Sequence, residues 1–536
     1  MSLQLSYPGV YVQEVPSGVR TITGVATSIT AFVGRTARGR SDSPITITSY
    51  ADFEREFGGL WKESTLGFAV RDFYLNGGST AIVVRLYRAE DGVGAKPGKS
   101  VFTVGGSLQL RAATDGAWGN ALRGRVDHTT RPHDTALGET TTSLFNLYIR
   151  DDTTGAIEGH RNVVVAPADH PRLVTKVLEN ESRLATVAAP GGARPAVSGD
   201  TVDLGKTVWD DNTAPTNAKP SGGGLSSDGL AITAAEFTGT GLETAKKGLF
   251  SLENADLFNL LVIPPYKSDG TLDTTIVTAA NTMCERRRAV QLVDALPTWD
   301  EVGDVTTAFA GGFATALGTD SKNAALLFPR LRQPNPLKDD QVETFAAGGA
   351  VAGVIARTDS QRGVWKAPAG LEATLAGVPQ LAVPLTDGEI GQLNPLGVNC
   401  LRAMPGAGRV VWGSRTMQGA DRLASEWKYL PVRRTALFLE ESLFRGTHWV
   451  VFEPNDEPLW AQIRLNVGTF MNNLFRLGAF QGTTPREAYF VKCDKETTTQ
   501  ADIDLGVVNI HVGFAPLKPA EFVVIRLQQM SGQSEV

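Results

Sequence analysis

Hydrophobic residues follow two different periods near the start of the chain, and these periods predict strands and helices in alternation. Ile29–Val33 is predicted to be a strand, and Ala81–Leu86, with the sequence AIVVRL, is predicted to be a buried strand. Ala51–Phe57 and Leu66–Leu75 lie between them and carry apolar residues at helical spacing. An Asn-Gly-Gly sequence ends the second helix. We expect a compact α/β unit here.

The pattern changes after a linker rich in Gly and Lys at residues 90–100. Short stretches with alternating or β-branched residues then follow one another, separated by polar connections that contain Gly and Thr. The expected strands are Val101–Val104, Ser107–Ala112, Leu144–Arg150 and His160–Val165. Such a series is typical of a β-sandwich-like insert. Loops rich in Pro, Gly and Ser close this region between residues 190 and 230.

Strands and helices alternate again between about residues 230 and 385. The expected strands are Leu257–Ile263, Ala289–Asp294 and Ala324–Phe328, and the expected helices are Thr274–Arg288, Val305–Leu317 and Val342–Arg357. Alternation of this kind predicts a mostly parallel sheet with helices on its faces.

Two helices and three strands are expected in the last part of the chain. Arg433–Phe444 is expected to be helical, and Pro458 lies just inside a second helix that Asn455 or Asp456 caps. Apolar residues recur in that helix at spacings of three and four, which predicts one buried stripe. The expected strands are His448–Phe452, Glu487–Cys493 and Val507–Phe514.

Two further strand-like stretches stand alone at the chain ends. One contains Val10, Tyr11, Val12 and Val15, and the other contains Phe522, Val523, Val524, Ile525 and Leu527. Pro and Gly or a polar tail separate each from its surroundings, so each needs a sheet to join. It is either an edge strand of its own domain or an arm that pairs with another copy of the chain.

Composition and charge exclude several classes of protein. The 536 residues are 42% hydrophobic and 20% charged, which suits a soluble protein of several domains, and the net charge of -6 does not suggest a nucleic-acid surface. The three cysteines are scattered, which fits folding in a reducing cytoplasm. We expect neither a secretory signal nor a membrane span. Release from the cell would then require a route such as lysis.

Motifs for catalysis and metal binding are weak. The stretch Gly92–Ser100 resembles a phosphate loop, but Val93 stands where the first glycine is required and Pro97 removes a backbone donor. His128 and His133 lie near aspartates in a polar loop, but their spacing fits no metal template. We expect no catalytic residue, no cofactor and no metal site.

Four blocks of sequence resemble the contractile tail sheath family of phages and related injection systems. They are YPGVYVQE from Tyr7 with Gly24–Gly34, FEREFGG from Phe53 with Phe68–Arg85, Leu393–Thr416, and Trp427–Gly478. Together the four blocks cover both ends of the chain, and their order and spacing make the resemblance specific.

The resemblance implies a multidomain α/β fold with an α+β core built from both chain ends, a subtilisin-like α/β domain without a catalytic triad, and a β-rich sandwich-like insert. The implied divisions are an N-terminal arm at 1–20, the first part of the core at 21–90, the insert at 101–200, the α/β domain at 225–388, the C-terminal part of the core at 389–518 and a C-terminal arm at 519–536. A triad is not expected because residues 230–385 contain no histidine.

The family's function implies that the chain is a structural subunit and not an enzyme. Copies would stack helically around an inner tube protein, donate their terminal strands to neighbouring subunits, and contract to drive the tube through a target envelope. The implied partners are the chain itself, the inner tube, and baseplate and terminator or cap proteins, without direct binding of nucleic acid or insertion into a membrane. Arg433 and Arg434 are expected to form salt bridges within or between subunits.

Two alternatives remain open at this point. The chain could be a baseplate or cap protein that shares the sheath core, or a hydrolase built on the α/β domain. A baseplate protein need not keep both terminal strands, and a hydrolase needs a nucleophile and a base within reach. Whether the chain is a sheath subunit or a baseplate or cap protein, we expect it to assemble in the bacterial cytoplasm and to become part of a virion tail or a released injection particle.

Overall fold

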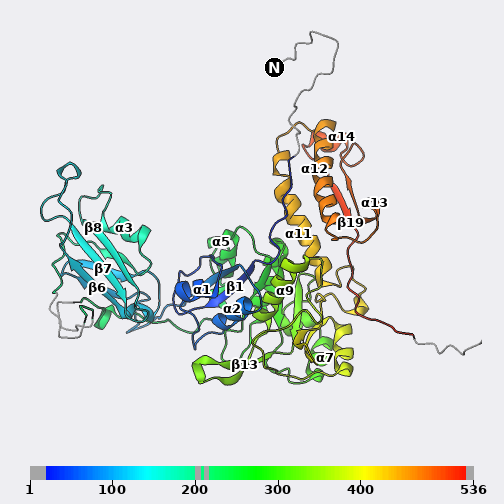
Figure 1. Cartoon of the computed structure of the whole chain (residues 1–536), viewed down its shortest axis with the longest axis horizontal. Coiled ribbons are helices and arrows are strands. Elements are labelled where there is room, and N and C mark those ends of the chain that lie inside the picture. The colour runs from blue at the N-terminus through cyan, green and yellow to red at the C-terminus, as the bar shows by residue number, and fades with distance from the viewer. Residues whose placement is uncertain (1–19, 200–206, 210–216, 527–536) are drawn as a thin grey trace, which may run out of the picture.

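The computed structural model describes residues 20–199, 207–209 and 217–526 of the chain. Figure 1 shows a β-rich part at one end of the molecule, a central α/β part, and a helical part that rises from the centre. The predicted N-terminal strand at Val10–Val15 and the last residue of the C-terminal strand, Leu527, lie outside the described residues.

The central part is built on an eight-stranded sheet with the order β17-β16-β12-β11-β10-β1-β3-β2. Neighbouring strands from β16 to β3 are parallel, and the two edge strands are antiparallel to their neighbours. The strands are β1 (Thr30–Arg35), β2 (Ile45–Ile47), β3 (Ala81–Leu86), β10 (Leu260–Val262), β11 (Val290–Asp294), β12 (Ala324–Phe328), β16 (Val398–Met404) and β17 (Gly408–Val411). The sheet therefore crosses the predicted boundary between residues 21–90 and 225–388.

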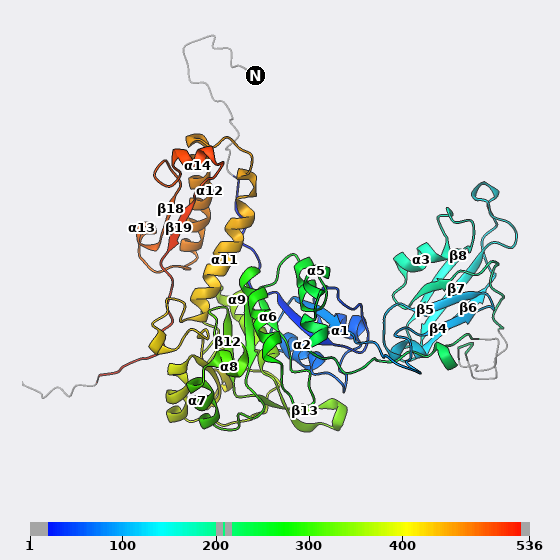
Figure 2. The same cartoon turned by 180° about the vertical axis from the view of Figure 1, so that it is seen from behind.

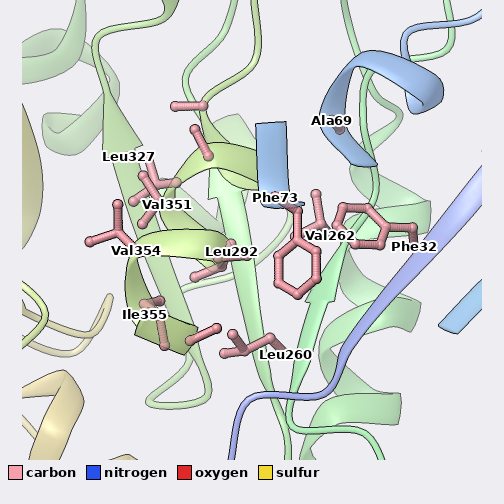
Figure 3. Close-up of a cluster of buried hydrophobic side chains, with 14 of the residues drawn as sticks. Phe32, Ala69, Phe73, Leu260, Val262, Leu292, Leu327, Val351, Val354 and Ile355 are labelled. Atoms are coloured by element: carbon pink, nitrogen blue, oxygen red, sulfur yellow. The ribbon is translucent and has the colours of Figure 1, made fainter. Parts of the chain in front are cut away.

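Helices cover both faces of this sheet. On one face, α2 (Leu66–Leu75) and α9 (Gly348–Arg362) bury a cluster that includes Phe32, Phe73 and Val262 (Figure 3). The two helices approach closely because α9 has glycines at the contact. A Cβ atom at Gly349 would lie 2.2 Å from the Ala69 carbonyl oxygen, so a side chain there would force the helices apart.

The other face of the sheet carries two more apolar clusters, to which α6 (Thr274–Arg286) contributes. The remaining helices around the sheet are α1 (Tyr50–Phe57), α4 (Ala234–Thr238), α5 (Leu242–Ala245), α7 (Val302–Ala310), α8 (Phe313–Leu317) and α10 (Asp387–Leu393). A separate small antiparallel sheet contains β13 (Leu331–Asn335), β14 (Gln341–Phe345) and β15 (Gln380–Leu381).

The β-rich part consists of two three-stranded antiparallel sheets with the orders β4-β5-β9 and β6-β7-β8. One apolar cluster contains residues of both sheets, among them Leu110 and Phe145, and of helix α3 (Val174–Glu181). The strands are β4 (Val101–Val104), β5 (Leu108–Ala112), β6 (Leu122–Asp127), β7 (Phe145–Asp151), β8 (Ile157–Val163) and β9 (Ala185–Ala189).

The helical part contains two long helices, α11 (Leu430–Gly446) and α12 (Glu457–Arg476). Asp456 caps α12 and Pro458 lies in its first turn, as predicted. A two-stranded sheet of β18 (Tyr489–Lys492) and β19 (His511–Phe514) packs beside α12, together with α13 (Pro485–Ala488) and α14 (Gln500–Asp504). Figure 2 shows the same grouping from behind.

Several predicted elements are wrong or incomplete. The expected helix Val342–Arg357 begins only at Gly348, because the alternating residues before it pair with β13 as strand β14. The expected strand His448–Phe452 is a 3-10 turn at His448–Val450. The expected helix Val305–Leu317 is split into α7 and α8 at a glycine pair. The predictions also missed β6 and β9, whose Arg-rich and Ala-rich sequences lack a clear apolar pattern.

The C-terminal stretch Phe522–Arg526 is not a strand in the single chain. A single stretch of this kind can form a strand only where a neighbouring strand supplies hydrogen-bond partners for its backbone. Within the described residues, no element pairs with them.

Candidate assembly interface

The end of the described chain exposes a continuous apolar stretch. The side chains of Phe522, Val523, Val524 and Ile525 are 75–82% exposed to solvent. Monomeric soluble proteins rarely expose contiguous large apolar residues of this kind, and such a patch normally marks a surface that another molecule covers. From here on, "C-terminal arm" means residues 522–526, the apolar stretch within the predicted arm at 519–536.

The C-terminal arm does not fold back onto the two-stranded sheet of its own chain. After β19, the chain runs away from this sheet towards the central part and leaves the molecule there (Figures 1 and 2). The two features that strand exchange would combine, an apolar arm and a small sheet, are therefore apart within one subunit.

The sheet formed by β18 and β19 has edges that an additional strand could join. Its four residue pairs run from Tyr489↔Phe514 to Lys492↔His511. Among the described residues, the two strands pair only with each other as named strands, and one isolated bridge, Phe480↔Pro516, continues the ladder beyond β19. A two-stranded sheet exposes backbone N–H and C=O groups along its outer edges, which makes it a template for a further strand.

One face of this small sheet is packed and the other is open. Tyr489, Val491 and Val512 lie against the apolar stripe of α12, whereas Phe490 points outwards and is 59% exposed. Phe490 lies opposite Gly513, where a Cβ atom would come within 2.1 Å of the Phe490 ring. The glycine thus lets the aromatic ring lie flat across the sheet, and an added strand would meet this apolar surface.

The N-terminal segment helps to hold the helical part that carries the sheet. Ile22 is buried in the apolar cluster of α12, and the backbone N–H of Arg20 donates to the Asn466 side chain over 3.1 Å. The N–H of Val25 donates to the Ser442 hydroxyl on α11 over 3.2 Å. The chain therefore enters the structure along α11 and α12, on the same body that carries β18 and β19.

Arg434 joins three distant segments in a buried ion pair. Its guanidinium lies 2.5 Å from the Asp359 carboxylate on α9, and both side chains are 3% exposed. It also donates to the Thr27 carbonyl over 2.9 Å, while the Thr27 hydroxyl donates to Asp359 over 2.6 Å. A buried charge with this many partners fixes α11 against α9 and the N-terminal segment.

Arg433 has a different environment on the same helix. It pairs with Glu440 over 3.2 Å, donates to the Asn323 side chain over 3.0 Å and stacks on the Trp427 ring at 4.8 Å. Burial lowers the pKa of Arg433 from its usual value. Both arginines thus hold contacts inside the chain, and a role for either between subunits stays a prediction.

Lys99 and His128, the residues considered for catalysis or metal binding, are held by local contacts. The Lys99 ammonium donates to the Ala113 carbonyl over 2.8 Å, and its partial burial lowers its pKa. A His128 ring nitrogen lies 2.9 Å from the Pro195 carbonyl oxygen. In the part of the chain that the structure describes, no group of three or more potential metal-binding side chains occurs, and no helix is long and apolar enough to cross a membrane.

Comparisons with known proteins agree with this architecture. The family model described as the phage tail sheath protein central domain matches residues 241–417. The model described as the phage tail sheath C-terminal domain matches residues 424–530. These two models are consecutive parts of one family and together cover more than half of the chain. The chain belongs to the phage tail sheath family.

Two phage tail sheath proteins share limited sequence with this family member. The tail sheath protein of Vibrio phage KVP40 is 26% identical over 198 residues, which are 37% of this chain and 28% of the relative. That of Enterobacteria phage T4 is 26% identical over 155 residues, which are 29% of this chain and 22% of the relative. The chain thus spans less than a third of the length of either relative.

Solved structures of sheath proteins share the fold over almost the entire chain. The anti-feeding prophage helical sheath in the contracted state matches with a TM-score of 0.55 and 21% identity, covering 98% of this chain and 99% of the other. A sheath tail protein from Listeria innocua matches with a TM-score of 0.56 and 13% identity, covering 92% and 96% of the two chains. These likenesses establish a mixed α/β multidomain sheath fold.

Proposed function

We propose that the protein is a sheath subunit that polymerises helically around an inner tube and contracts to drive this tube through a target envelope. The observation that carries the proposal is the exposed apolar C-terminal arm, which has no partner among the described residues of its own chain. Membership of the sheath family and the open edges of the β18–β19 sheet support it.

Strand donation explains how subunits remain connected while they move. If the arm of one subunit adds to the β18–β19 sheet of a neighbour, backbone hydrogen bonds supply the attachment and the alternating side chains supply burial. Val523, Ile525 and Leu527 would share one face of the added strand, and Phe522, Val524 and Arg526 the other. Fully burying each aliphatic side chain contributes about 1.5–3 kcal/mol. The N-terminal strand at Val10–Val15 would act in the same way from the other end.

The proposed role is structural and requires neither cofactor nor catalysis. The parallel sheet with helices on both faces is compatible with a subtilisin-like layout, but its strands and helices between residues 230 and 385 contain no histidine for a catalytic triad. The β-rich insert projects from the centre of the molecule in Figures 1 and 2, so we propose that it faces outwards in the assembled sheath.

The proposed partners are other copies of this chain, an inner tube protein, and baseplate and terminator or cap proteins. A baseplate partner is supported by the fold match to a chain in the anti-feeding prophage baseplate, with a TM-score of 0.54 and 20% identity. Assembly would take place in the bacterial cytoplasm, and the product would be a virion tail or a released injection particle.

Electron microscopy of the purified protein tests this proposal. We expect long hollow tubes with a wide lumen, because each subunit carries both an apolar arm and an open sheet edge. Negative staining at rising protein concentration, together with analytical ultracentrifugation, would detect them. A protein that remains monomeric at high concentration would contradict the proposal.

A further inference from the structure

A fully buried arginine holds the chain directly before the C-terminal arm. The Arg415 side chain is 0% exposed, and its Nε atom donates to a carboxylate oxygen of Glu521 over 2.8 Å. A terminal nitrogen of Arg415 contacts the second oxygen of the same carboxylate, so that the pair is bidentate. Arginine forms its strongest and most directional contacts with carboxylates in this arrangement.

Arg415 also has acceptors other than Glu521. Its second terminal nitrogen donates to the Asn394 carbonyl over 2.8 Å, to the Gly419 carbonyl over 3.1 Å and to the Asp421 carboxylate over 2.9 Å. Asp421 in turn pairs with Lys428 over 2.6 Å. These contacts hold the guanidinium in position independently of Glu521, so that it presents a binding site for one carboxylate.

The backbone of Arg415 is tied to the central sheet. Its N–H donates to the Asn399 side chain over 2.6 Å, and the Asn399 amide donates to the Arg415 carbonyl over 2.8 Å and to the Leu326 carbonyl over 3.0 Å. Asn399 lies in β16 and Leu326 in β12, which are adjacent strands of the eight-stranded sheet. Glu521 is thus connected to the central sheet through Arg415, and the Tyr429 hydroxyl also donates to its carboxylate over 3.5 Å.

The segment around Glu521 lines a groove with the central part. Residues 517–522 line this groove of about 990 Å³ together with residues of the central part, among them Trp412, Arg402 and Asp387. This segment leads from β19 in the small sheet to Glu521 at the central part. A pull on the arm would reach β19 along this segment unless Glu521 resists it.

We infer that the Arg415–Glu521 pair is an anchor that fixes where the C-terminal arm leaves the subunit and transfers load on the arm to the central sheet. The load then bypasses β18 and β19, so one subunit can hold its neighbour through its arm while its own small sheet remains undistorted and able to accept a strand. This role of the anchor rests on the proposed function, whereas the fixed exit point is a property of the single chain.

Distance measurements between spin labels test the anchor in the full-length chain. Labels at Val524→Cys in the arm and Gln392→Cys on the exposed side of α10 would report the exit point, and the native cysteines are all buried. At a dilution where the protein sediments as a monomer, we expect one narrow distance distribution. Glu521→Gln should broaden it markedly, because the neutral amide cannot satisfy the buried guanidinium bidentately.

Glu243→Gln is the matched control, since Glu243 forms an exposed ion pair with Arg286 over 3.1 Å far along the sequence from the arm. It should leave the distribution narrow. An equally narrow distribution in Glu521→Gln, with an unchanged melting temperature, would overturn the anchor.

The assembly assay separates this result from the proposed function. If Glu521→Gln broadens the distribution but the unmodified protein forms no tubes, the anchor stands and the sheath function fails. If tubes form and the distribution is insensitive to Glu521→Gln, the sheath function stands and the anchor fails. If both hold, tubes of Glu521→Gln should require a higher protein concentration to form than tubes of Glu243→Gln.

Discussion

Replacing Ile525 with proline is expected to abolish tube formation while leaving the single subunit folded. Proline removes one backbone donor from the ladder that the arm would form in a neighbouring subunit. Ile525 is exposed in the single chain and contributes to no apolar cluster there. The substitution should therefore change the free energy of unfolding of the single subunit very little. Deleting residues 1–19 should impair assembly in a similar way from the other end.

Val93→Pro is the control for this change. Val93 is also an exposed aliphatic residue outside any helix or strand, but it lies in the linker before the β-rich part. The Val93→Pro variant should form tubes as the unmodified protein does. Sedimentation and electron microscopy measure assembly, and thermal unfolding of the dilute protein measures the fold. A lowered melting temperature in Ile525→Pro would mean that the stretch belongs to its own subunit's core, and normal tubes would mean that the strand is not donated.

The second large effect is expected from Arg434→Ala. The change leaves the buried Asp359 carboxylate without its charge partner and also removes the contact to the Thr27 carbonyl. Removing one member of a buried ion pair typically destabilises a protein by about 3–5 kcal/mol. Because Arg434 joins α9, α11 and the N-terminal segment, the loss should appear as a lower free energy of unfolding in urea.

Arg362→Ala tests whether burial causes this effect. Arg362 lies near the end of the same helix as Asp359 and pairs with Glu372 over 3.0 Å, but both side chains of this pair are more than half exposed. Exposed pairs contribute about 0–1 kcal/mol. If the free energy of unfolding falls by a similar amount in the two variants, the buried Arg434–Asp359 pair stabilises the fold no more than an exposed pair does.

Local sequence patterns predict an element well where its residues are uniformly buried or are buried along one face. The runs at Leu66–Leu75 and Ala81–Leu86 match α2 and β3 residue for residue, since a buried helix face and a fully buried strand leave clear signatures. The sequence QVETF before α9 looked helical in its context, and only its pairing with β13 makes it a strand. Strand β6 contains two arginines and few apolar residues, so its sequence gives no clear strand pattern.

The interface was only partly predictable. The apolar arm at Phe522–Ile525 stands out in the sequence, but its lack of a partner among the described residues of its own chain became visible only in three dimensions. The Arg415–Glu521 contact joins residues that are 106 positions apart, and neither residue type nor spacing points to such a pair. Likewise, the order of strands in the central sheet depends on long-range packing that periodicity does not encode.

Cross-linking between subunits tests strand exchange most directly. One variant would carry Ile525→Cys or Val524→Cys, to cover both faces of the arm, and a second would carry Phe490→Cys on the open face of the small sheet. Because all native cysteines are buried, a short bismaleimide would react at the introduced cysteines. The Cβ atoms of residues that lie directly opposite each other on adjacent strands are about 5 Å apart, which is within reach of such a reagent. In tubes assembled from an equal mixture, we predict cross-linked dimers that contain one chain of each variant and that are absent from the dilute monomers. Tubes that form without such dimers, or a cross-link within single chains that carry both changes, would contradict the account.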